Sequence, residues 1–65
     1  MKSIKDQYEE IKVAISQIEP DIQKFIHKGM SQSALRSRNG LRDIRNKIEK
    51  LRNDIQEQRK SEKND

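Results

Sequence analysis

The spacing of the apolar residues is the feature that most constrains what this chain can fold into. In the first half, apolar side chains recur in alternating steps of four and three residues, at Ile4, Tyr8, Ile11, Ile15, Ile18, Ile22 and Phe25. In the second half, the same spacing places Ala34, Leu41, Ile44, Ile48, Leu51 and Ile55. A helix with this heptad repeat carries a narrow apolar seam, whereas a strand would need apolar residues at every second position. We therefore expect an all-α chain with helices over residues 3–28 and 31–59.

The interruption between the two apolar patterns predicts a tight turn at Gly29. Glycine adopts the left-handed backbone conformation that ends many helices at little steric cost. His27 and Lys28 would lie in the last turn of the first helix, where the helix dipole favours positive charge. Ser31 or Ser33 can cap the second helix by accepting a hydrogen bond from a free backbone N–H group.

Such a short turn makes the helices antiparallel neighbours, so we expect one helical-hairpin domain over residues 1–65, with a frayed tail at 60–65. Pro20 lies inside the first helix and predicts a kink there, or else the start of a separate short helix. Gly40 lies inside the second helix, where the missing side chain lets other atoms approach the backbone. Close packing of the two helices is the favoured explanation of Gly40, and close approach of a ligand is the alternative.

The chain is too short and too polar to build a large core by itself. It has 65 residues, of which 29% are hydrophobic and 40% are charged, and it has no cysteine for a disulfide or a thiolate metal site. Disorder is one outcome of such a composition, but the regular heptads argue against it. Pairing with a second copy would bury both apolar seams, so we expect a homodimer that forms a four-helix bundle. A different protein as the partner is the alternative.

The positive charge is concentrated in the second half of the chain. The net charge is +4, yet residues 1–27 sum to −1 and residues 28–60 sum to +6. Four arginines spaced seven residues apart occupy one heptad position beside the apolar seam: Arg38, Arg45, Arg52 and Arg59. Such a row suits the phosphates of a nucleic acid, but it suits carboxylates of a neighbouring helix equally well. The acids of the first helix that could take that second role are Asp6, Glu9, Glu10, Glu19 and Asp21.

The turn offers a second place for a phosphate. Lys28 and Gly29 stand directly before the start of the second helix, whose free N–H groups and partial positive charge favour an anion. Arg36 and Arg38 follow within about two helical turns. The turn could therefore hold one phosphate while the arginine row contacts others.

The sequence around the turn resembles a family of small, basic, histone-like bacterial proteins, the linker-histone-like proteins of the chlamydial type. The positions that carry the resemblance are Asp21, Lys24, Phe25, Lys28, Gly29, Ala34, Arg36, Arg38, Leu41, Asp43, Ile44, Arg52, Ile55, Gln56 and Glu57. The Lys-Gly turn followed by two arginines is the most specific part, and the resemblance covers about residues 18–60. It implies DNA binding and nucleoid organisation without strong sequence preference.

We therefore expect a non-sequence-specific DNA-binding protein that contacts phosphates through basic residues of the turn and of the second helix. The expected DNA-binding residues are Lys28, Arg36, Arg38, Arg42, Arg45, Lys50 and Arg52. One alternative is a structural coiled-coil or adaptor protein whose arginines form salt bridges, and another is a hairpin that binds structured RNA. We expect no catalytic residues, metal, cofactor, small-molecule substrate or membrane segment, and a cytoplasmic location at the nucleoid.

Overall fold

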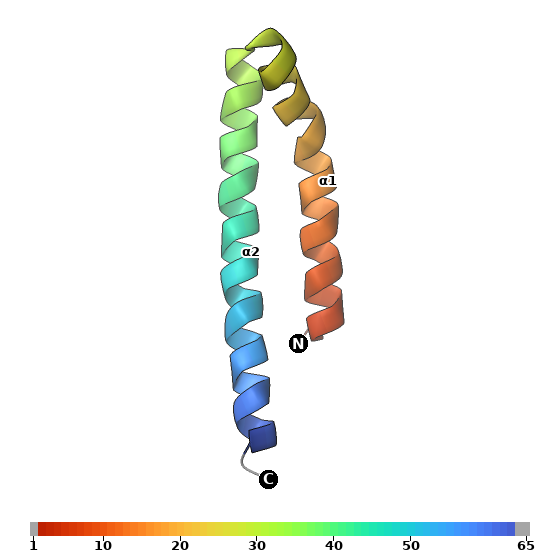
Figure 1. Cartoon of the computed structure of the whole chain (residues 1–65), viewed down its shortest axis with the longest axis vertical. Helices are drawn as coiled ribbons and strands as arrows, with labels where there is room; N and C mark the ends of the chain where they lie inside the picture. The colour runs from red at the N-terminus through yellow and green to blue at the C-terminus, as the bar shows by residue number, and fades with distance from the viewer. Residues whose placement is uncertain (1, 64–65) are drawn as a thin grey trace.

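The computed structural model describes the backbone of residues 2–63 and the side chains of residues 2–60. Two helices, α1 (Ile4–Lys28) and α2 (Ser31–Lys63), run antiparallel and are joined by a turn of two residues, Gly29 and Met30 (Figure 1). They form a thin rod of 54 × 17 × 15 Å with the turn at one end. The predicted all-α hairpin is confirmed.

Local hydrogen bonds fix both ends of α1. The hydroxyl of Ser3 accepts a hydrogen bond from the backbone N–H of Asp6 at 3.1 Å, which caps the first turn. At the other end, Gly29 has a φ of 63° and its N–H donates to the carbonyl of Phe25 at 2.9 Å. His27 and Lys28 lie in the last turn, as the helix dipole favours. The glycine therefore ends α1 where the sequence placed the turn.

The start and end of α2 differ from the expectation. The backbone carbonyl of Met30, and no serine side chain, receives the first N–H, that of Ala34 at 3.1 Å. The Ser33 hydroxyl is fully buried and has no hydrogen-bond partner, so it does not act as a cap. At the other end, the helix continues past residue 59 to Lys63, because residues 56–63 are mostly Gln, Glu, Arg and Lys, which favour helix. The last two residues of the expected frayed tail lie outside the described residues.

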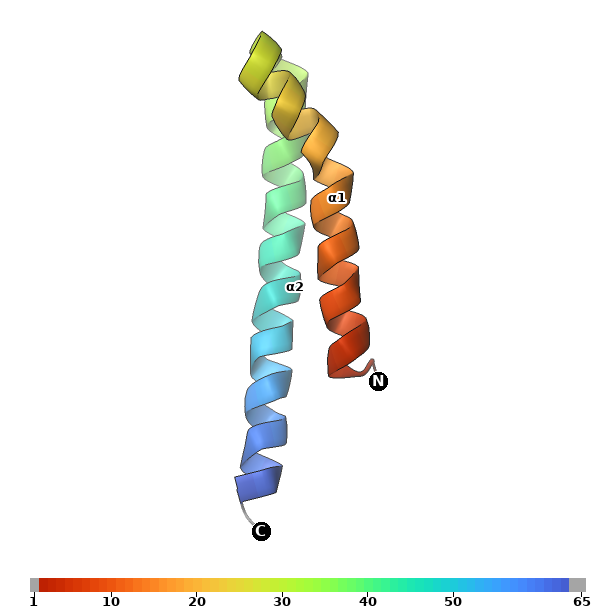
Figure 2. The same ribbon diagram turned by 45° about the vertical axis from the view of Figure 1, so that its right-hand side comes forward.

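Pro20 bends α1 without ending it. The helix is continuous from Ile4 to Lys28, which excludes a separate short helix starting at Pro20. Beyond Pro20 the helix changes direction and leans across α2 near the turn (Figure 2). Proline has no N–H for the carbonyl of Ser16 and crowds the preceding turn, so a bend at this position is the expected result. As a result, α1 crosses α2 near the turn, whereas the two helices run side by side along the rest of the rod (Figure 2).

The two helices meet along a line of small and aliphatic residues. This contact line consists of buried or half-buried positions spaced three and four apart: Gln7, Ile11, Ala14 and Ile18 on α1, and Ser33, Ser37, Gly40 and Ile44 on α2. A Cβ atom added to Gly40 would overlap the side chain of Ile18. The prediction that Gly40 serves close helix packing is therefore confirmed.

Half of the predicted apolar seam does not face the other helix. Tyr8, Ile15, Leu41, Ile48 and Ile55 keep 40–53% of their surface exposed. The reason is that a heptad seam has two sides, and a hairpin gives each helix only one neighbour. Gln7, Ser33 and Ser37, which are polar, take up the buried side instead.

These exposed residues lie together on one side of the hairpin. Tyr8, Ile15, Leu41 and Ile48 each follow a contact-line position by one or four residues, and Ile55 continues the α2 row seven residues after Ile48. In antiparallel helices the same offset turns both rows toward the same side. We call this surface the apolar face, and it consists of Tyr8, Ile15, Ile22, Leu41, Ile48 and Ile55.

Candidate nucleic-acid interface

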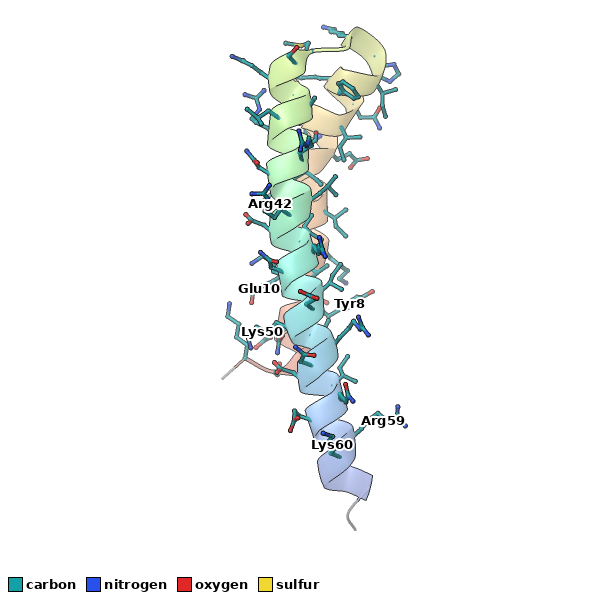
Figure 3. All side chains as sticks on the ribbon, turned by 90° about the vertical axis from the view of Figure 1, so that its left-hand side faces the viewer. Tyr8, Glu10, Arg42, Lys50, Arg59 and Lys60 are labelled. Carbon is teal, nitrogen blue, oxygen red and sulfur yellow. The ribbon has the colours of Figure 1, made fainter. Side chains whose placement is uncertain are left out.

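The arginine row lies along the α2 edge of the apolar face. Three arginines each come four residues after an apolar position: Arg38 after Ala34, Arg45 after Leu41 and Arg52 after Ile48. Each arginine is therefore one helical turn beyond its apolar residue and rotated by about 40° around the helix axis. Arg59 continues the row, and Figure 3 shows it pointing to the same side of the hairpin as Tyr8. All four side chains are exposed. Seven residues of helix separate neighbours by about 10.5 Å, which gives a regular line of positive charge.

The acids of α1 do not neutralise this row. Within residues 2–60, the only arginine in an ion pair is Arg36, whose Nε lies 3.0 Å from Oδ1 of Asp21. Lys2 pairs with Glu10 at 2.6 Å, and Lys12 pairs with Glu9 at 3.1 Å. Three α1 carboxylates pair with lysines or with Arg36, and none pairs with the row, so the row keeps its guanidinium groups available to a partner in solution.

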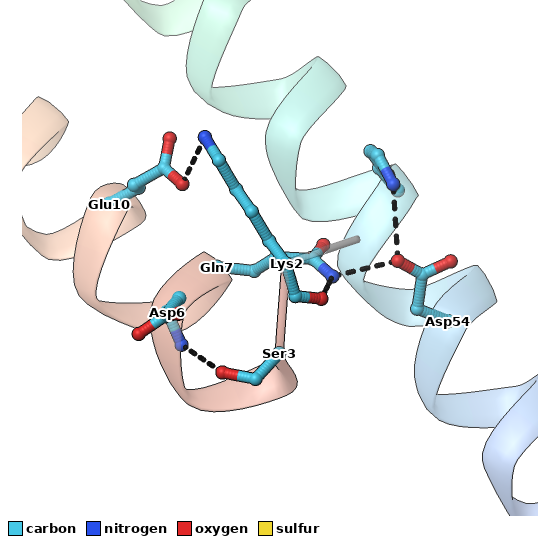
Figure 4. Close-up of polar contacts among 7 residues, drawn as sticks. Lys2, Ser3, Asp6, Gln7, Glu10 and Asp54 are labelled. Carbon is cyan, nitrogen blue, oxygen red and sulfur yellow. Dashed lines mark hydrogen bonds and ion pairs between the residues drawn. The ribbon is translucent and has the colours of Figure 1, made fainter.

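The opposite side of the hairpin carries the polar contacts between the helices. The side-chain amide of Gln7 donates to Oδ2 of Asp54 at 2.7 Å, and Lys50 reaches the same oxygen at 3.2 Å (Figure 4). Figure 3 shows Glu10 and Lys50 on this side, away from Tyr8. We call this surface the polar face. It sets the alignment of α1 against α2 through Gln7 and, near the turn, through Asp21 and Arg36.

Two carboxyl groups of the polar face are stabilised in their charged form. Hydrogen bonds from Gln7 and then Lys50 hold the pKa of Asp54 below its ordinary value. The hydrogen bond from Lys2 lowers the pKa of Glu10, with smaller attraction from Lys47. Both groups are therefore ionised, hydrogen-bonded parts of the folded hairpin at neutral pH.

The seven expected DNA-binding residues fall into three places. Arg38, Arg45 and Arg52 belong to the row, whereas Arg42 is exposed on the outer surface of α2, and Figure 3 shows it on the same side as Glu10 and Lys50. Lys28 is exposed at the turn, in the last residue of α1. Arg36 and Lys50 lie on the polar face in ion pairs with Asp21 and Asp54. The structure thus brings three of the seven together in the row, and it separates Arg36, Arg42 and Lys50 from them.

One basic residue at the turn was not among the expected site residues. Lys24 is exposed one turn before Lys28, near the end of α1. The sequence signal that points to it is a stretch with no acid: residues 22–42 contain no Asp or Glu, but they contain five Lys or Arg. The turn end of the rod is therefore positive on both helices.

The described part of the chain holds neither a cluster of metal-ligating side chains nor a membrane-spanning helix. No group of three or more potential metal-ligating side chains lies together within it. Neither helix has, over the residues described, an apolar stretch of the length and hydropathy that crosses a lipid bilayer.

Comparison with known proteins identifies the family. The chain matches the family described as histone H1-like protein Hc1 over residues 5–61, which includes the turn, the arginine row and the whole contact line. No curated protein and no solved structure matches the chain. Because the match covers most of its length, the chain belongs to the histone H1-like protein Hc1 family.

Proposed function

We propose that this chain binds double-stranded DNA without strong sequence preference and acts as a histone-like protein of the nucleoid. The observation that carries the proposal is the row of exposed arginines that the acids of α1 leave unpaired. Membership of a histone H1-like family supports DNA as the polyanion. Location at the nucleoid follows from the same proposal.

The spacing of the row suits phosphates better than base edges. From Arg38 to Arg59 the row extends over about 31 Å of helix, close to the roughly 34 Å of one turn of B-DNA. Side by side, the two helices measure 17 × 15 Å across, too wide to enter a major groove of about 12 Å. The body of the hairpin therefore lies across the groove and contacts the backbone, which carries no sequence information.

We also propose that a second copy covers the apolar face. Five large apolar side chains there are 40–53% exposed, and they line one side of the rod over most of the length of α1. Two hairpins packed through this face form a four-helix bundle. In that bundle the heptad positions that stay exposed in a single hairpin are buried. The arginine row stands at the edge of that interface, so each dimer presents two rows.

A test of the proposal is titration of a random-sequence 30-base-pair duplex at about 50 and 200 mM salt. Six to ten phosphate contacts would lower the affinity by about 10³–10⁵ over that range. Weak binding with little salt dependence would contradict the proposal and favour an adaptor whose apolar face binds another protein. Equal or tighter binding to an RNA duplex would favour structured RNA as the ligand.

A pair of matched variants tests which face meets the DNA. Arg45→Gln with Arg52→Gln removes two charges from the row, and Lys47→Gln with Lys50→Gln removes two charges from α2 outside the row. If the row contacts phosphates, the first variant lowers the slope of log affinity against log salt by about two and the second lowers it much less. Equal losses would mean that the charge of α2 as a whole, rather than the row, drives binding.

A further inference from the structure

The turn end of the rod combines exposed apolar side chains with unopposed positive charge. Ile26 is the most exposed large apolar residue described, at 63%, and Phe25, Met30 and Leu35 are 41–57% exposed. These residues lie around the turn, and Met30 is part of it. Leu35 is on the side of α2 that faces away from α1, since it falls half a turn from the contact-line residues Ile44 and Ser37. A second copy on the apolar face would therefore leave Leu35 uncovered.

The charge around these side chains has one sign. Lys24 and Lys28 are exposed at the end of α1, and Arg38 and Arg42 are exposed on α2 near the turn. The nearest acid before the stretch, Asp21, is occupied by Arg36. The turn end of the rod therefore suits a partner that has negative charge outside and apolar groups inside. Duplex DNA is such a partner, since its phosphates border stacked bases.

We propose that the turn docks end-on against duplex DNA and wedges Ile26 and Met30 into a base step from the minor groove, a contact that rests on the DNA binding proposed above. The body of the rod is too wide to enter a groove, so only side chains at its end, in and beside the two-residue turn, can reach a base step (Figure 1). Apolar side chains that enter the minor groove in this way unstack the step and kink the duplex by about 20–90°. Lys24 and Lys28 lie one helical turn apart on one face of α1, where they can hold phosphates on one side of the wedge.

This arrangement gives each chain two separate DNA contacts with different roles. The arginine row supplies affinity that depends on salt, and the turn supplies a bend at steps that unstack easily, such as TA. The Gly29 conformation supports this role, because it ends α1 sharply and leaves Met30 exposed at the end of the rod.

The test uses a 30-base-pair duplex with fluorophores at both ends and 2-aminopurine in a central TA step. At saturating protein, the wild-type chain should shorten the end-to-end distance, as a bend of at least about 20° does, and raise the 2-aminopurine fluorescence. Ile26→Ser with Met30→Ser should abolish both signals and change the affinity less than tenfold. The control, Val13→Ser, alters a similarly exposed residue of α1 far from the turn and should leave both signals unchanged.

The outcomes separate this inference from the proposed function. Binding without a bend or unstacking, or a bend that survives the double substitution, would overturn the wedge and leave the arginine row untouched. No binding at all would overturn the proposed function and the wedge with it. Loss of anionic-vesicle binding in the double variant, with no bend of DNA by the wild-type chain, would assign the turn to a lipid surface instead.

Discussion

Replacing Gly40 with alanine tests the packing of the hairpin most directly, because two physical effects of opposite sign meet at this residue. In an exposed helix, Gly→Ala stabilises by about 1 kcal/mol, since alanine loses less backbone entropy on folding. At Gly40 the new Cβ would overlap the side chain of Ile18, and the overlapping atom is a methyl on the branched Cβ of Ile18. Such a methyl cannot swing away as the end of a long side chain would.

The magnitude follows from these two terms. Overpacking of this kind costs about 1–3 kcal/mol, which offsets the gain of about 1 kcal/mol and leaves Gly40→Ala neutral to about 2 kcal/mol destabilising. Truncating Ile18 to alanine removes the overlapping methyl. In that background Gly40→Ala should recover its full gain of about 1 kcal/mol, so the coupling energy between the two sites should be about 1–3 kcal/mol.

The assay is urea denaturation of four variants followed by circular dichroism at one fixed chain concentration, because the proposed dimer would make stability depend on concentration. Asn39→Ala serves as the control, since Asn39 is the exposed neighbour of Gly40 on α2. That substitution should stabilise by about 0.5 kcal/mol through helix propensity alone. If Gly40→Ala stabilises the chain more than Asn39→Ala does, the helices do not pack closely at this position and the reasoning is refuted.

Three further predictions concern the turn, the polar face and the apolar face. Gly29→Ala should destabilise by about 1–2 kcal/mol, because Gly29 has a φ of 63° although nothing lies near its missing side chain; a neutral result in denaturation would refute the left-handed turn. The lowered pKa of Asp54 and of Glu10 means that the folded state binds fewer protons than the unfolded state, so stability should fall as pH drops below about 4, through both lowered pKa values. Asp54→Asn should reduce this loss of stability at acid pH, measured as melting temperature against pH. An unchanged loss would exclude Asp54 as one of its causes. If the proposed dimer forms, Ile48→Glu should shift the chain toward monomer in sedimentation, whereas Val13→Glu, at a more exposed residue off the apolar face, should not. Equal shifts would exclude the apolar face as the interface.

The sequence predicted the local features well because each depends on neighbours in the chain. Gly29 ends α1 through its own backbone freedom. Pro20 bends α1 for an equally local reason. The caps were not predicted: Ser3 caps α1 through a bond from Asp6, and the expected Ser31 or Ser33 cap of α2 does not form. The end of α2 was predicted too early because the apolar pattern stops at Ile55, but helix propensity carries α2 on to Lys63.

The sequence could not predict which side of each heptad seam faces the other helix. Ile11 and Ile44 are buried, but Ile15 and Ile48, which carry the same pattern, are half exposed. The choice depends on the sizes of residues on opposite helices, above all on Gly40 fitting against Ile18. In the same way, the pairing of Arg36 with Asp21 depends on how the turn aligns the two helices, and spacing along one helix does not contain that information.

The alignment of the two faces has a consequence for how assembly and DNA binding depend on each other. Arg38, Arg45 and Arg52 border the apolar face, whereas the carboxylates that accept hydrogen bonds, Glu10 and Asp54, are on the polar face. In the proposed dimer, the second copy removes water from one side of each arginine. A guanidinium near a dry apolar surface attracts a phosphate more strongly, because the local dielectric constant falls. Dimerisation and DNA binding should therefore reinforce each other, and by linkage DNA should stabilise the dimer by the same free energy.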